Sequence, residues 1–163
     1  MQDIISRLRA KKQDEGFTLI ELLVVVVIIG VLVAIAVPVY LNYRKGAADK
    51  SAQSDVRGAV SAVEQFYTDN GNTYPDTIAG TNSGTGGVAS LTLNATAITG
   101  ATTQTITLSD KTQLGFVHAT GSTTYLLCGN NLGGSNKWYV YNSANGGSVK
   151  ASTATSMNLT SCT

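Results

Sequence analysis

Histidine, tryptophan, cysteine and proline are scarce in this chain of 163 residues, which holds one, one, two and two of them. The single histidine, His118, has no evident partners for a metal cluster or a histidine-based catalytic triad. The acidic residues Asp69, Asp76 and Asp110 do not follow a calcium-loop pattern. The sequence therefore predicts no catalytic residue, no metal site and no cofactor.

A surplus of charge of one sign is also lacking, because the net charge is only +1. Removing residues 1–16 takes away four basic and three acidic side chains, and the remainder then carries seven of each. Binding to nucleic acid depends on a surplus of Lys and Arg that neutralises phosphates. We therefore expect no direct specific binding of nucleic acid.

The chain does contain one long apolar run, the 25 residues from Phe17 to Leu41, in which Glu21 is the only charge. About 20 such residues let a helix cross the hydrocarbon core of a membrane. From Asn42 onward the sequence is polar and rich in Gly, Ser, Thr and Asn. This pattern predicts a single-pass hydrophobic stem followed by a soluble head.

The apolar run differs from a secretory signal peptide, because it exceeds the usual 7–15 residues and no clear small-residue cleavage site follows it. Basic residues flank it on both sides, and the small excess before it favours a cytoplasmic N-terminus. They are Arg7, Arg9, Lys11 and Lys12 before the run, and Arg44, Lys45 and Lys50 after it.

The two cysteines, Cys128 and Cys162, both lie in the polar part. An even pair behind an export-type segment favours one disulfide in an oxidising compartment, which places the head outside the cell. The bond would close a loop and stabilise the head by roughly 3–4 kcal/mol. Two buried free thiols are the alternative.

Helical periodicity continues beyond the apolar run. From Ala48 to Tyr67, apolar residues recur at steps of three and four, which forms one face of an α-helix. Asn70-Gly71 suits a helix C-terminus, and Pro75 prevents the helix from resuming. The pattern predicts one helix over residues 17–70, with residues 17–41 as its apolar half and a length of roughly 80 Å.

The head, residues 71–163, contains short runs rich in β-branched and aromatic residues, which predict strands. Short glycine-containing turns between them suit antiparallel hairpins. We expect the sheet to cover the apolar helix face around Val56–Phe66. The predicted strands are 90–93, 104–109, 114–120, 123–129 and 137–143.

Two further features of the head have structural interpretations. Gly80–Gly87 is low in complexity and is expected to form a surface loop. Trp138, Tyr139 and Tyr141 could form a binding stripe, but alternation places Trp138 on the opposite side from the two tyrosines. We therefore expect these aromatic rings to pack in the core or on a sheet face.

The segment GFTLIELLVVVVIIGVLVAIAVPVYLNYR resembles the class III signal and N-terminal helix of type IV pilins and the related pseudopilins. A short hydrophilic leader ends in Gly16, Phe17 follows, Glu21 is the fifth residue after the glycine, and Pro38 comes near the end of the apolar run. Arg44–Pro75 also looks like Gram-positive members of the family. The resemblance implies an α+β type IV pilin fold, with a long N-terminal helix packed on a C-terminal antiparallel sheet.

The resemblance further implies that residues 1–16 are a leader, which prepilin peptidase removes by cutting between Gly16 and Phe17. A residue without a side chain lets a protease approach the backbone closely. The new amine of Phe17 would then be methylated. Family leaders commonly carry Lys or Arg beside the glycine, whereas Asp14 and Glu15 stand there in this chain.

Four residues are candidate assembly residues. A buried carboxylate takes up a proton or pairs with a cation, and for Glu21 the resemblance supplies the Phe17 amine of a neighbouring subunit. A helix-start carboxylate that complements the macrodipole is the alternative for Glu21. Gly30 permits close helix approach, and Pro38 removes one intrahelical hydrogen bond. In several family members the segment between these two residues loses helicity in the filament.

The resemblance implies a structural subunit and not an enzyme. It would be made as a single-pass membrane precursor and polymerised by a pilus assembly platform and its ATPase. The product would be a homo-oligomeric filament on the cell surface that serves adhesion, motility or DNA uptake. A pseudopilin of a type II secretion or competence system is one alternative, and a membrane-anchored binding or enzymatic head is another.

Overall fold

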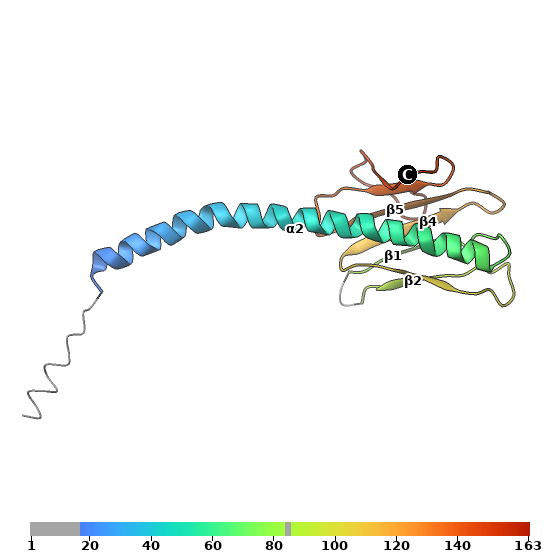
Figure 1. Ribbon diagram of the computed structural model, residues 1–163, viewed down its shortest axis with the longest axis horizontal. Helices are drawn as coiled ribbons and strands as arrows, with labels where there is room; N and C mark the ends of the chain where they lie inside the picture. The colour runs from blue at the N-terminus through green and yellow to red at the C-terminus, as the bar shows by residue number, and fades with distance from the viewer. Residues whose placement is uncertain (1–16, 84–85) are drawn as a thin grey trace, which may run out of the picture. The chain divides into compact units, whose positions relative to one another are not determined.

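The computed structural model describes residues 17–83 and 86–163 (Figure 1). The predicted leader, residues 1–16, therefore lies outside the described residues, and so does Gly16. The chain divides into two compact units, Met1–Tyr40 and Leu41–Thr163, each of which is described by itself.

A single helix, α2 (Leu19–Asp69), contains residues of both units (Figure 1). It begins two residues later than the apolar pattern, because Thr18 caps its first turn. It ends at Asp69 because the backbone then turns left-handed, with φ of 62° at Gly71 and 64° at Asn72. Glycine is the residue that most readily adopts such angles at a helix C-terminus.

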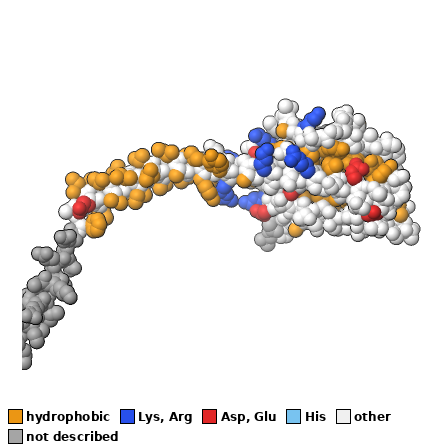
Figure 2. Space-filling model, in the orientation of Figure 1, with side chains coloured by type: hydrophobic (Ala, Val, Ile, Leu, Met, Phe, Trp, Pro, Cys, Tyr) orange, Lys and Arg blue, Asp and Glu red, His pale blue; other side chains and the backbone are white. Residues whose placement is uncertain are grey.

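In the first unit, the large apolar side chains of the helix are all exposed, between 48% at Val25 and 82% at Leu19. Figure 2 shows this segment as a nearly continuous apolar surface. Among the described helices, α2 is long and apolar enough to cross a membrane. The residues that the structure describes therefore leave this surface exposed, and an exposed apolar surface of this size is typical of a site that lipid or other protein covers.

The second unit contains a five-stranded antiparallel sheet in the order β1-β4-β5-β6-β7 and a separate antiparallel pair, β2-β3 (Figure 1). The predicted α+β fold, a long N-terminal helix packed on an antiparallel sheet, is confirmed. The strands are β1 (Ile78–Thr81), β2 (Ser90–Leu93), β3 (Gln104–Thr107), β4 (Thr112–His118), β5 (Tyr125–Asn131), β6 (Tyr139–Asn142) and β7 (Lys150–Ala151).

The structure corrects the expected loop over Gly80–Gly87, because Gly80 and Thr81 belong to strand β1. Gly80 pairs with Leu114 of β4. A Cβ atom at this glycine would lie only 2.5 Å from Leu91 Cδ2, so any larger residue here would have to displace the buried Leu91 side chain of β2. The sequence pattern also missed β7 and did not separate β2 and β3 into a second sheet.

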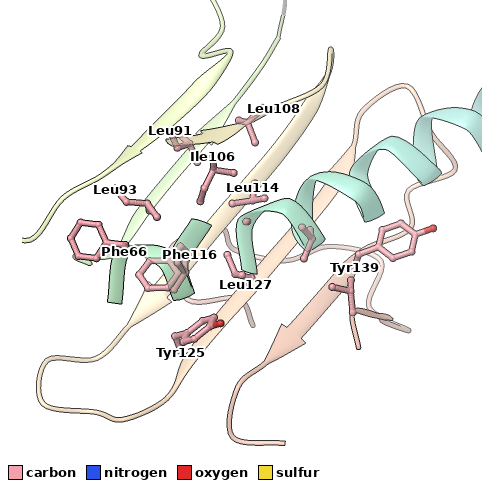
Figure 3. Packing of buried hydrophobic residues seen from close by; sticks show 14 of the residues in the cluster. Phe66, Leu91, Leu93, Ile106, Leu108, Leu114, Phe116, Tyr125, Leu127 and Tyr139 are labelled. Atoms are coloured by element: carbon pink, nitrogen blue, oxygen red, sulfur yellow. The ribbon is translucent and has the colours of Figure 1, made fainter. Parts of the chain in front are cut away.

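The main core lies between α2 and the sheets (Figure 3). Helix residues at steps of four and three are fully buried, namely Ala52, Val56, Ala59, Val63 and Phe66. They pack with Leu114, Phe116 and Leu127 of the central strands. Burying each large apolar side chain is worth about 1.5–3 kcal/mol, so this interface holds the second half of α2 on the sheet.

A second, smaller cluster contains Trp138 with the disulfide between Cys128 and Cys162. The predicted disulfide is therefore present, and the alternative of two free thiols is wrong. Trp138 belongs to this cluster whereas Tyr139 and Tyr141 join the main core, so the predicted alternation is confirmed. The bond ties β5 to the end of the chain.

Candidate functional site

Residues Phe17–Glu21 form the start of the exposed apolar segment. The Glu21 backbone N–H donates to Thr18 Oγ1 over 3.3 Å. In return, Glu21 Oε2 accepts one hydrogen bond from the Thr18 backbone N–H and one from Thr18 Oγ1, each of 2.8 Å. This reciprocal arrangement is a capping box, which satisfies backbone donors that a helix start leaves unpaired.

The capping box gives Glu21 a local role besides a contact with a neighbouring subunit and the complementing of the helix macrodipole. The signal was present in the sequence as Thr18-Leu19-Ile20-Glu21, since Ser or Thr followed three residues later by Glu is the usual pattern. The box turns the carboxylate back toward the N-terminal end of the helix. It uses Oε2, and Oε1 takes no part in it.

The surroundings of Glu21 are apolar and open to the outside. Phe17, Ile20, Val24 and Val25 line a shallow depression together with the carboxylate. Phe17 is 80% exposed and Ile20 is 66% exposed. The chain therefore presents a charged group within an uncovered apolar surface, which is the geometry of a contact that a second molecule completes.

Gly30 and Pro38 both lie inside α2, and the helix is continuous through them. In the described part of the chain, no atom outside the local helix backbone comes within 4 Å of the place where a Gly30 Cβ would stand. No described contact within the chain therefore requires a glycine at this position. The structure does not bring these two residues together with Glu21, since all three are spread along one helix.

The polar side chains of the head act as links between α2 and its neighbours. Asp55 accepts hydrogen bonds from the backbone N–H and hydroxyl of Ser109, at 2.8 and 2.9 Å. Asp49, although only 4% exposed, accepts from the backbone N–H and hydroxyl of Ser135. These carboxylates hold the segments around Ser109 and Ser135 in place.

His118 and the tyrosines are likewise engaged in packing. His118 Nε2 lies 2.8 Å from the Ser122 carbonyl oxygen, to which it donates. The Tyr74 ring lies 5.2 Å from His118 and 5.1 Å from Tyr125. Burial, assisted by the neighbouring Glu64 carboxylate, raises the pKa of Tyr125 above the ordinary tyrosine value. Among the described residues, no group of three or more His, Cys, Asp or Glu could hold a metal ion.

Comparison with protein families matches residues 11–37 to a prokaryotic N-terminal methylation motif. This range contains Gly16, Phe17, Glu21 and Gly30, and it stops one residue before Pro38. The match therefore covers the segment in which the predicted processing and assembly residues lie, with the exception of Pro38.

Three curated relatives extend the similarity. The chain is 32% identical over 104 residues to fimbrial protein EcpC of Eikenella corrodens, an alignment that covers 54% of this chain and 68% of the relative. It is 40% identical over 77 residues to type IV major pilin protein PilE1 of Neisseria gonorrhoeae, an alignment that covers 47% of this chain and 43% of that relative. It is 37% identical over 70 residues to type II secretion system core protein G of Aeromonas hydrophila, and this alignment covers 43% of the chain and 48% of the relative. The chain thus spans only about half the length of the latter two relatives.

Proposed function

Because the chain belongs to the type IV pilin family, we propose that it is the precursor of a structural subunit that polymerises into an extracellular pilus. One observation carries the proposal: the first half of α2 is an uncovered apolar surface with a single carboxylate near its start. Membrane lipid would cover this surface before assembly and neighbouring stems would cover it in the filament. The transfer exchanges one apolar environment for another, so it need not be costly.

Maturation would begin with prepilin peptidase, which would cut between Gly16 and Phe17 and expose the Phe17 amine for methylation. The match to the N-terminal methylation motif supports this step. The new amine would belong to the residue before Thr18, whose backbone N–H already donates a hydrogen bond to the Glu21 carboxylate. Processing would thus create a cation beside a carboxylate that is positioned for it.

Glu21 would direct assembly by pairing with the Phe17 amine of a neighbouring subunit. An ion pair in an apolar interior sets register more reliably than it adds stability, because both charges lose water. The capping box leaves Oε1 outside its own hydrogen bonds, so the carboxylate has an oxygen for the incoming amine. Gly30 would let stems approach closely, and Pro38 would ease a local loss of helix between these two residues.

The precursor would reside in the cytoplasmic membrane with its head outside, and an assembly platform with its ATPase would extract it into the fibre. The fibre, rather than the isolated subunit, would serve adhesion, motility or DNA uptake. We propose no enzymatic activity, because the carboxylates Asp49 and Asp55 and the single histidine of the head hold loops and turns.

A pseudopilin of a secretion or competence system is the second candidate. The similarity to type II secretion system core protein G, which extends over 70 residues, favours it. The disulfide-closed head favours the pilin. The two differ in where the mature protein accumulates, because a pilus extends from the cell and a pseudopilus does not.

Intact mass and N-terminal sequencing of material sheared from the cell surface test the proposal. A pilin is expected to appear there in abundance, beginning at Phe17 and heavier by one methyl group. A form beginning at Phe17 in the membrane, with none in the sheared fraction, would point to the pseudopilin. A membrane form that still begins at Met1 would contradict both and leave an anchored head of another function.

A further inference from the structure

A groove of about 560 Å³ lies in the second unit, Leu41–Thr163. One side of it is formed by the first turns of α2 in this unit, and the other side by the turn that joins β3 to β4. Three of the side chains that line it are cationic, Arg44 and Lys45 of α2 and Lys111 of the turn, and all three are exposed. Asp110 also lines it, so three positive charges face one negative charge. Figure 2 shows basic side chains gathered at one end of this unit.

Lys111 occupies a backbone position that disfavours lysine. It is the third residue of a turn in which the Thr112 N–H donates to the Ser109 carbonyl over 3.0 Å, and its φ is 61°. Turns with a positive φ at this position usually carry Gly or Asn there. The Lys111 carbonyl accepts from the Leu132 N–H at 2.9 Å, so the turn is anchored through its backbone. These backbone contacts could be made by any residue, so they do not account for a lysine at this position. We therefore look to its side chain for the role of Lys111.

The Lys111 side chain lies beside Gly133, and Ala48 of α2 borders the same space. A Cβ atom on Gly133 would stand 3.5 Å from Lys111 Cδ and 4.0 Å from Ala48 Cβ, so these atoms share one narrow space. Lys111 thus lines the same groove as Arg44 and Lys45, and like charges that share a groove repel one another unless an anion joins them.

The helix carboxylates Asp49 and Asp55 do not line this groove. Asp49 is buried and accepts hydrogen bonds from Ser135, and Asp55 accepts two from Ser109. Both carboxylates keep their charge but are directed to these serines. Within the lining of the groove, three cations therefore face Asp110 alone, and a ligand that balances them must bring negative charge.

The position of the groove in the chain indicates the source of that charge. Arg44 and Lys45 follow Leu41, the last residue of the apolar run, by three and four residues. Tyr40 and Tyr43 are 61% and 76% exposed at the same point, and tyrosines are enriched where a spanning helix leaves the membrane. Basic side chains beside such a helix attract anionic lipid headgroups.

We propose that this groove binds the phosphate of an anionic phospholipid headgroup on the outer face of the membrane that holds the precursor. The inference rests on the membrane-anchored stage of the proposed function. The Arg44 guanidinium offers two parallel N–H groups to phosphate oxygens, and Lys45 and Lys111 add charge from either side. This contact holds the head on the membrane surface until the stem is extracted.

The test uses the full chain in phosphatidylcholine vesicles that contain a spin-labelled lipid. Electron paramagnetic resonance gives the preference for phosphatidylglycerol over phosphatidylcholine next to the protein. One Lys or Arg near an anionic surface favours association by about fivefold, so the wild type is expected to prefer phosphatidylglycerol at least fivefold in 0.1 M NaCl. The preference should approach one in 1 M NaCl, where the Debye length falls from about 10 Å to about 3 Å.

Lys111→Gly is the decisive variant, because it removes the cation and also the backbone strain of a non-glycine residue at a positive φ. It is expected to lower the preference about fivefold without lowering the thermal stability of the head. Arg44→Gln should lower it by a similar factor. Lys150→Gln, on β7 and outside the lining of the groove, removes the same charge and should leave the preference unchanged.

Equal effects of Lys111→Gly and Lys150→Gln would overturn the inference, since bulk charge would then explain the preference. So would an unchanged lipid preference in Lys111→Gly accompanied by weaker cross-linking between subunits, because the groove would then bind a second copy of the chain. If the protein fails to float with vesicles at all, the membrane stage of the proposed function fails. If it floats but shows no preference, only the headgroup site is refuted.

Discussion

The Tyr125 hydroxyl donates a 2.6 Å hydrogen bond to Glu64 Oε1 and so joins strand β5 to helix α2. The Tyr125 side chain is only 2% exposed, and its ring lies 5.5 Å from Phe116 and 5.7 Å from Tyr141. A buried phenol needs a partner for its hydroxyl. The contact therefore satisfies a buried polar atom and fixes the second half of α2 on the sheet at the same time.

Replacing Tyr125 by Phe is expected to destabilise the head by about 1 kcal/mol, because one hydrogen bond to a largely exposed carboxylate is lost. Tyr125→Ala should cost about 3–5 kcal/mol, since it leaves a cavity in the core. Urea denaturation of the full chain measures both. A Tyr125→Phe variant as stable as the wild type would show that the hydrogen bond contributes nothing net.

The stability of the head should fall at alkaline pH. Burial, and then the adjacent Glu64 carboxylate, raises the pKa of Tyr125, and burial likewise raises the pKa of Tyr74 and Tyr139. The folded state therefore holds these protons more tightly than the unfolded state, in which tyrosine ionises near pH 10. This contribution is fully present below about pH 10 and is lost as the pH rises above it.

Urea midpoints at pH 8 and pH 10.5 measure that dependence. The free energy of unfolding is expected to fall by up to about 1.4 kcal/mol per pH unit for each tyrosine that stays protonated only in the folded state. Tyr125→Phe should show a shallower fall than the wild type. Identical slopes for the two proteins would mean that Tyr125 does not contribute.

The disulfide between Cys128 and Cys162 closes a loop with a sequence separation of 34. Its reduction is expected to lower the free energy of unfolding by roughly 3–4 kcal/mol, because the unfolded chain regains the entropy of the open loop. Urea unfolding with and without a reducing agent measures the difference. The Cys128→Ser, Cys162→Ser double variant should match the reduced protein and show no further response to the reductant.

Glu21→Gln is expected to leave the protein processed and in the membrane but to prevent efficient assembly, because the neutral amide cannot pair with a neighbouring Phe17 amine. The amount of sheared filament relative to the membrane pool measures this loss. A filament yield equal to that of the wild type would contradict the assembly role.

Thr18→Val separates assembly from capping. It removes the hydroxyl of the capping box, which should destabilise the first helical turn by about 0.5–2 kcal/mol, while the Glu21 charge remains. Its filament yield should therefore fall much less than that of Glu21→Gln. If the two variants lose filaments equally, Glu21 acts through the helix start and not through a neighbouring subunit.

The sequence already contained whatever depends on local pattern. The apolar run from Phe17 to Leu41 is visible in composition, and the rest of α2 is visible because its buried face recurs at the helical period. With only two cysteines, one pairing was available to the disulfide. The capping box of Thr18 and Glu21 is equally local, and its four-residue pattern is present in the sequence.

Only the tertiary structure decided what depends on partners far along the chain. Strand β1 has no alternating apolar pattern of its own, and it becomes a strand by pairing with β4 more than 30 residues later. The Glu64–Tyr125 bond and the convergence of Arg44, Lys45 and Lys111 likewise join separate segments. A local pattern reports which face a residue prefers, whereas these contacts depend on which segments meet, and that is settled only when the whole core packs.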